Sequence, residues 1–215
     1  MEQSIASLRA ALQANPDFSS RTEEDIVGDY RLQRFLMSRG NDLEKAKALF
    51  EDHLKWRKEH NLEAIRAKVI DKPLLVASLP HTAELKAAGM GMLHSVINGG
   101  RSRTGEIIHI EVIGGTAHIL IPEGHSEEYV EKLYEHYYGF FERRCIEMER
   151  LSKSEQRFVR SIQIRDFSQM SMMPQGGVMN VVRKILKSGL GKECINETSA
   201  VTIAYSPILT TLAGA

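Results

Sequence analysis

The stretch from residue 31 to residue 57, RLQRFLMSRGNDLEKAKALFEDHLKWR, contains the end of one predicted helix and most of the next. Gly40 and Asn41 commonly end helices, and Asp42 is a typical N-cap for the helix that follows. Apolar residues then recur with a period close to 3.6 up to about residue 60, which indicates a helix with one buried face. We therefore predict helices over residues 22–38 and 42–60 that pack together as a hairpin.

The segments beside this hairpin show weaker helical patterns. A short helix is predicted over residues 4–14, and the Asn15-Pro16 pair should end it. After the hairpin, any long periodic run over residues 61–100 is interrupted by Pro73, Pro80, Gly89 and Gly91. We expect short helices and loops in that part of the chain.

The second half of the chain alternates between two hydrophobic periods. Residues 108–112, 159–165 and 200–205 have apolar side chains at every second position, as β-strands do. Residues 126–151 and 174–189 instead repeat at the helical period. Strand, helix, strand, helix, strand predicts an α/β fold in which neighbouring strands run parallel.

The composition excludes several functional classes. Lysine and arginine together number 28, and so do aspartate and glutamate. A chain without net charge has no overall field to gather nucleic acid or to drive strong adhesion to a membrane. We therefore expect no nucleic-acid partner, and any contact with a membrane should be local.

The ends of the chain favour a cytoplasmic location. The first residues, MEQSI, include an acid where a signal peptide would carry basic charge, and no apolar core follows. The last segment, residues 200–215, is apolar but shorter than a spanning helix and contains Pro207. Since cytoplasmic thiols stay reduced, we expect no disulfide between Cys145 and Cys194.

The sequence contains none of the common catalytic or nucleotide-binding signatures. It has no phosphate-binding glycine loop, no nucleophile elbow and no His-Glu-x-x-His arrangement. Cys145 could form a nucleophile pair with a histidine, but it falls on the apolar face of the helix over residues 126–151, where packing is the expected role. His109, His118 and Asp166 have ordinary structural interpretations. We predict that the chain is not an enzyme and needs no metal or cofactor.

Two further clusters have both a functional and a structural interpretation. The segment over residues 167–173, FSQMSMM, carries flexible thioether side chains that suit an adaptable apolar surface, and they could equally fill gaps in a core. Basic residues collect near the end of the helix over residues 174–189, where a lipid phosphate could bind but where the helix dipole alone also favours them.

The hairpin resembles the N-terminal helices of CRAL-TRIO lipid-binding proteins, a family that includes phosphatidylinositol and tocopherol transfer proteins. The Leu-x-Arg-Phe-Leu, Asp-x-x-Lys-Ala and Trp-Arg elements occur in register over residues 32–57. Further on, residues 103–111, 164–167 and 204–207 are similar to the family's strand start, its strand ending in Asp-Leu and its Asn-Ala-Pro segment. The resemblance covers roughly residues 22–212.

The resemblance implies an apolar pocket above a sheet, one bound lipid, a mobile gating helix and no covalent chemistry. Arg39 matches a family position close to the inositol phosphate of the lipid, although Gly40 stands where that family has a lysine. Glu197 is similar to the acid of the family's Tyr-Pro-Glu-Arg segment and is predicted as a further lipid contact. The family also continues beyond the Pro207 position into its gate and a further strand, so we expect the lipid-binding domain to be incomplete at its C-terminus. We predict that the pocket is lined by Ile108, Ile110, Tyr137, Ser161, Gln163, Met170 and Met172.

The predicted architecture is therefore an N-terminal helical region over residues 1–70 and an α/β domain over residues 71–215. In the latter, helices cover a mixed or parallel sheet that carries an apolar lipid pocket. The predicted function is to bind one phospholipid or similar hydrophobic ligand as a monomer, and to transfer it at a membrane surface with which the chain associates transiently. The alternatives are a protein-interaction or regulatory module that has lost its ligand, and a hydrolase that uses Cys145 or a histidine.

Overall fold

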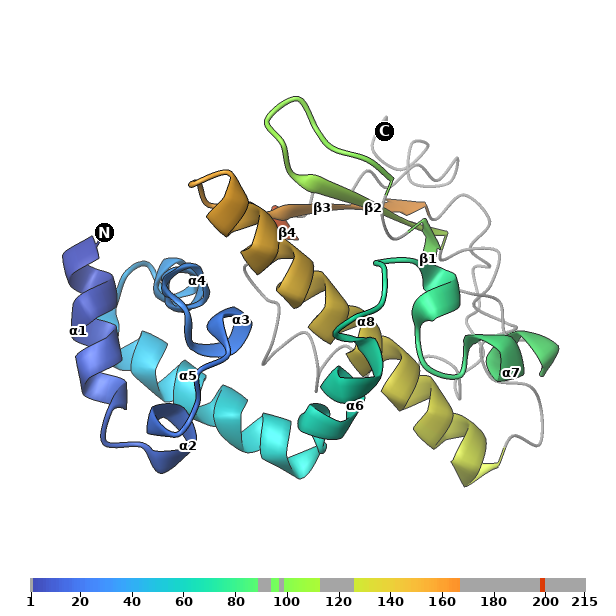
Figure 1. Ribbon diagram of the computed structural model, residues 1–215, viewed down its shortest axis with the longest axis horizontal. Helices are drawn as coiled ribbons and strands as arrows, with labels where there is room; N and C mark the ends of the chain where they lie inside the picture. The colour runs from blue at the N-terminus through green and yellow to red at the C-terminus, as the bar shows by residue number, and fades with distance from the viewer. Residues whose placement is uncertain (1, 89–93, 97–98, 113–125, 167–197, 200–215) are drawn as a thin grey trace, which may run out of the picture.

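The computed structural model describes residues 2–88, 94–96, 99–112, 126–166 and 198–199 (Figure 1). Helices account for most of these residues, and the strands form one small sheet. The helices are α1 (Glu2–Leu12), α2 (Pro16–Ser19), α3 (Glu24–Val27), α4 (Asp29–Ser38), α5 (Leu43–Glu59), α6 (Leu62–Val69), α7 (Thr82–Ala87) and α8 (Glu127–Ser154), with a 3-10 turn at η1 (Val76–Ser78). The strands are β1 (His94–Val96), β2 (Ile107–Val112), β3 (Ser161–Asp166) and β4 (Thr198–Ser199).

The predicted hairpin is present, and its second helix begins where the sequence indicates. The Asp42 carboxylate accepts a hydrogen bond from the Lys45 backbone N–H at 3.0 Å, which satisfies an N–H group that has no partner within the helix. Helix α5 then continues to Glu59. Its buried face, which includes Phe50 and Leu54, packs against α1 and α4.

The prediction of one continuous helix over residues 22–38 is wrong. Gly28 adopts an extended conformation, with φ −69° and ψ 168°, and its N–H bonds the Glu24 carbonyl at 2.7 Å. A Cβ atom at this position would lie 2.2 Å from that carbonyl oxygen, so the chain bends where only glycine fits. The segment consequently forms two helices, α3 and α4.

The sheet has the strand order β1-β2-β3-β4. Strands β2 and β3 are parallel, as are β3 and β4, which confirms the predicted parallel arrangement of an α/β fold. Strand β1 pairs with β2 in the antiparallel direction and was not predicted, since residues 61–100 show no clear alternation. The strand predicted over residues 200–205 and the helix predicted over residues 174–189 lie outside the described residues.

Helix α8 runs diagonally beneath the sheet and also reaches the N-terminal helices (Figure 1). Ser126 caps it by accepting a hydrogen bond from the Tyr129 N–H at 3.2 Å, and acidic residues occupy its first turn. Apolar residues of α8 belong to a core that also contains Trp56 and Ile107, while a separate apolar cluster holds α1 to α5 together. The helix therefore connects the sheet to the hairpin. The domain boundary at residue 70 stays a prediction.

Candidate functional site

The parallel pairing of β2 and β3 decides which side chains share a face of the sheet. Ile108 lies beside Ile162, and Ile110 lies beside Ile164. Because side chains alternate along a strand and paired residues point the same way, these four residues form one face and their neighbours form the other. The second face carries Ile107, His109, Ser161 and Gln163.

The face with polar residues packs toward α8. All four of its side chains are buried, and the His109 ring meets Phe140 of α8 edge-on with centroids 5.4 Å apart. The Arg144 guanidinium, also from α8, is fully buried and lies over the rings of Phe140 and Phe141. This side of the sheet is thus closed by a helix and holds a buried polar cluster.

The opposite face carries four isoleucines side by side across β2 and β3. We call it the isoleucine face, and its four members are Ile108, Ile110, Ile162 and Ile164. Each of these side chains remains partly exposed, whereas the polar residues between them are buried. The isoleucines therefore lie on the side of the sheet away from α8, whereas the polar side chains face that helix.

The structure divides the sequence-predicted pocket residues between two sides of the sheet. Ile108 and Ile110 belong to the isoleucine face. Ser161 and Gln163 lie on the other face, and Tyr137 of α8 belongs to the same core cluster as Ile107. These five residues therefore do not share one surface. The register pairs Ser161 with Ile107 and Gln163 with His109, so both side chains lie on the face opposite to Ile108 and Ile110.

The remaining predicted contacts lie elsewhere. Arg39 follows the end of α4 and is half-buried, with its guanidinium donating to the Ser38 carbonyl at 3.4 Å. Met170, Met172 and Glu197 lie outside the described residues. Sequence reasoning missed Ile162 and Ile164. The signal was available, since β3 alternates and the predicted parallel pairing with β2 would have placed its isoleucines beside those of β2.

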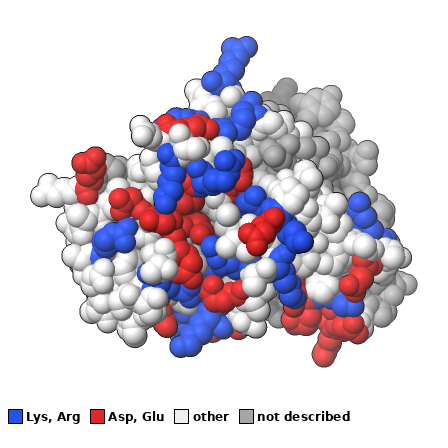
Figure 2. Space-filling view, in the orientation of Figure 1, with Lys and Arg blue, Asp and Glu red and all other residues white. Residues whose placement is uncertain are grey.

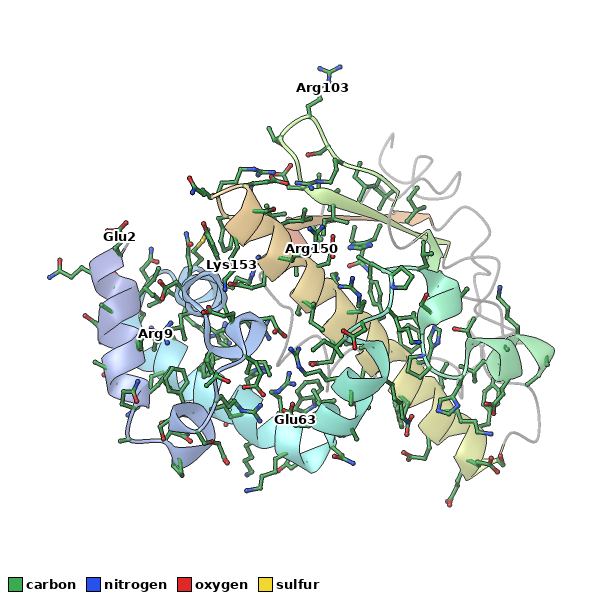
Figure 3. All side chains as sticks on the ribbon, in the orientation of Figure 1. Glu2, Arg9, Glu63, Arg103, Arg150 and Lys153 are labelled. Carbon is green, nitrogen blue, oxygen red and sulfur yellow. The ribbon has the colours of Figure 1, made fainter. Side chains whose placement is uncertain are left out.

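Buried polar contacts fix the hairpin to α8 and to the start of β3. Arg34 of α4 donates to the Val159 carbonyl at 2.7 Å, and Arg31 donates to the Cys145 thiol at 3.3 Å. Cys145 is 6% exposed, in agreement with the predicted packing position. Near the end of α8, Lys153 pairs with Glu24 of α3 at 3.3 Å (Figure 3).

The carboxyl group of Glu149 is the most perturbed acid at this interface. The side chain is 4% exposed, and burial raises its pKa to about 7, although the nearby Arg34, Lys153 and Arg31 act in the opposite direction. The negative charge of Glu24 also raises the pKa of Glu149. A carboxyl group with this pKa changes its charge near neutral pH.

The described residues show neither a metal site nor a membrane-spanning helix. Within those ranges, no group of three or more His, Cys, Asp or Glu side chains is placed to hold a metal ion. No described helix is both long enough and apolar enough to cross a membrane. Lys and Arg side chains are interspersed with Asp and Glu side chains over the face that Figure 2 shows.

A helical hairpin is joined to a small α/β sheet through one long helix, which is consistent with the CRAL-TRIO-like fold that the sequence resemblance implies. The chain is similar to the crystal structure of Sfh5, with a TM-score of 0.57 and 13% sequence identity over 99% of this chain and 73% of that chain. This likeness supports the fold that the sequence resemblance predicts. The sequence matches no protein-family model and no curated protein sequence.

Proposed function

We propose that the chain binds one hydrophobic molecule of the lipid class against the isoleucine face and exchanges it at a membrane surface. The observation that carries this proposal is the difference in polarity between the two faces of the sheet. The buried polar residues His109 and Gln163 face the covering helix, whereas four isoleucines lie side by side on the other face. The CRAL-TRIO-like fold, which the likeness to Sfh5 supports, gives the proposal its second basis.

Apolar burial supplies the driving force for such binding. Each CH₂ group removed from water contributes about 0.8 kcal/mol, so a long acyl chain can offset most of the cost of leaving a bilayer. Four branched side chains on the parallel pair β2 and β3 offer apolar surface that an acyl chain could cover. The proposal therefore specifies an acyl chain or another extended hydrocarbon, and it leaves the head group open.

The proposed binding uses shape and apolar burial without covalent chemistry. The absence of catalysis, the cytoplasmic location and the monomeric state remain predictions from the sequence. So does the transient contact with a membrane. A bound lipid that leaves the protein intact and unchanged in chemical identity is the expected behaviour.

Native mass spectrometry of the full chain, purified gently from cells, tests the proposal directly. We expect an added mass that extraction identifies as a lipid, and uptake of a fluorescent phospholipid from vesicles by protein stripped of it. The variants Ile108→Asn and Ile162→Asn should reduce uptake at least about fivefold, because an amide on this surface loses its water without gaining a partner.

Ile70→Asn is the matched control, since Ile70 has 40% of its surface exposed and lies just beyond α6, away from the sheet. This variant should take up lipid as the original chain does. Protein that neither retains nor accepts a lipid would leave the ligand-free interaction module as the better description. Equal losses in all three variants would show that the isoleucine face is not the binding surface.

A further inference from the structure

A cavity of about 410 Å³ lies between the end of α5, α6 and α8. We call it the α6–α8 groove. None of its lining residues comes from the sheet, so it is separate from the isoleucine face. The residues that line it are Glu59, His60, Asn61, Ala64, Ile65, Lys68, Glu131, Tyr134, Glu135 and Tyr138.

Aromatic rings form one wall of the groove. The rings of Tyr134 and Tyr138 are stacked with centroids 6.2 Å apart and an interplanar angle of 13°. The centroid of the His60 ring lies 5.3 Å from that of Tyr138. The Trp56 ring contacts both of them, with centroid distances of 5.3 Å to Tyr138 and 5.5 Å to His60. Tyr138 is only 4% exposed, so the wall is held in place by packing. The faces of such rings carry partial negative charge and attract cations.

Carboxylates dominate the charge of the groove. Glu59, Glu131 and Glu135 line it, against one ammonium group from Lys68. Lys68 already pairs with Glu135 at 2.5 Å, and Glu59 forms an exposed pair with Lys55 at 3.8 Å. Within the part of the chain that the structure describes, no basic group lies within 4 Å of Glu131. A bound anion would meet this excess of negative charge, whereas a cation would reduce it.

Glu135 keeps its negative charge at neutral pH. Burial raises the pKa of Glu135, but hydrogen bonds from Lys68 and His81 outweigh that effect and hold the pKa below its usual range. Glu131 is exposed on the first half of α8. The groove therefore combines fixed negative charge with aromatic surface.

We propose that the α6–α8 groove binds a small organic cation, a quaternary or primary alkylammonium group. Alkyl groups on nitrogen would pack against Tyr134 and His60 while Glu131 and Glu59 balance the charge. A volume of about 410 Å³ accommodates a group of this size together with some water. The same chemistry occurs in free amines and in choline-type lipid head groups, so the test includes both.

Trp56 provides a direct signal for the test, because it is the only tryptophan in the chain and its ring contacts both His60 and Tyr138. The full chain is titrated with choline chloride, with sodium chloride adjusted to keep the ionic strength constant. We expect a saturable change in Trp56 emission. The neutral analogue 3,3-dimethylbutan-1-ol, which has the same shape without the charge, should bind at least about threefold more weakly.

Variants of the lining residues test the assignment of the groove. Glu131→Gln and Tyr134→Ala should each weaken choline binding about threefold or more, and Lys68→Met should strengthen it about twofold. Glu127→Gln is the matched control, since it removes the same charge from the same helix outside the groove and should change nothing. A thermal melt of each variant checks that it is folded.

Three results would overturn the proposal: no saturable signal with choline, equal binding of the neutral alcohol, or unchanged binding in Glu131→Gln. Phosphocholine separates the two sources of the cation. If phosphocholine binds more tightly than choline, the groove takes a lipid head group. If phosphocholine binds more weakly, the groove takes a free amine, because its carboxylates repel the added phosphate.

Discussion

Arg57 of α5 and Glu142 of α8 form an ion pair with two hydrogen bonds, 2.6 and 3.0 Å long, although each side chain is only 2% exposed. Arg57 also donates from Nε to Glu63 at 3.1 Å, and Figure 3 marks Glu63 near the start of α6. Arg57 belongs to the Trp-Arg element of the sequence. That element therefore connects the hairpin to the helix beneath the sheet.

Replacing Glu142 by leucine should lower the free energy of unfolding by about 3 to 5 kcal/mol, because the buried Arg57 guanidinium would lose its main partner. The double variant Arg57→Met with Glu142→Leu should recover most of that loss. Urea unfolding followed by Trp56 emission measures both. Glu51→Gln, which removes a partly exposed partner of Lys47 at 4.0 Å, should cost less than about 1 kcal/mol. A small effect of Glu142→Leu would show that the pair is not a structural anchor.

Arg34 should be a second anchor between the hairpin and the sheet. Its guanidinium bonds the Val159 carbonyl at 2.7 Å and lies 4.5 Å above the Phe158 ring. Arg34→Met should lower the free energy of unfolding by about 2 kcal/mol, and Arg34→Lys by less, since lysine keeps the charge but not the planar group. Arg39→Met on the same segment serves as the control and should have little effect. Equal effects of Arg34→Met and Arg39→Met would contradict this role.

The raised pKa of Glu149 should make stability depend on pH. Since folding raises this pKa from 4.5 to about 7, the folded chain binds the proton more tightly than the unfolded chain. The resulting stabilisation is complete below about pH 4.5 and is lost as the pH rises through about 7, with a total of about 3 kcal/mol at most. Glu149→Gln should therefore stabilise the protein at about pH 8 and change little at about pH 4.5.

Urea unfolding of Glu149→Gln and the original chain at both pH values gives this difference directly. All other ionisable groups are the same in the two proteins, so their effect cancels from this difference. Glu127→Gln, an exposed acid on the same helix, should show no such dependence. A difference for Glu149→Gln that stays constant with pH would rule out the proposed titration.

Close packing should require glycine at position 139, even though this position lies within helix α8, where alanine is ordinarily the more favourable residue. A Cβ atom there would lie 2.6 Å from Cδ and 3.0 Å from Cγ of Pro80. Gly139→Ala should therefore lower the melting temperature, with a cost of about 1 to 3 kcal/mol from the overlap that outweighs the helix preference of alanine, worth about 1 kcal/mol. Adding Pro80→Ala should relieve the overlap. A higher melting temperature for Gly139→Ala alone would show that Pro80 moves aside readily.

Local signals in the sequence predicted most of the described elements. Asp42 and Ser126 were read as helix starts, and both accept a backbone hydrogen bond in that role. The change of period near residue 108 located β2 and β3, and the intervening helix predicted their parallel pairing. The interruption at Gly28 was missed, because glycine within a helical pattern is often tolerated and the conflict with the Glu24 carbonyl appears only in three dimensions.

The sequence by itself determined the hairpin, the long helix and the alternation of strands and helices, because capping and hydrophobic period act between residues that are close along the chain. Only the tertiary structure decided which face of the sheet α8 covers, since that depends on how the helix packs against β2 and β3. It also decided the partners of Arg57 and Arg34, which lie 85 and 125 residues away. Contacts over such separations depend on how whole elements pack, and no local pattern specifies them.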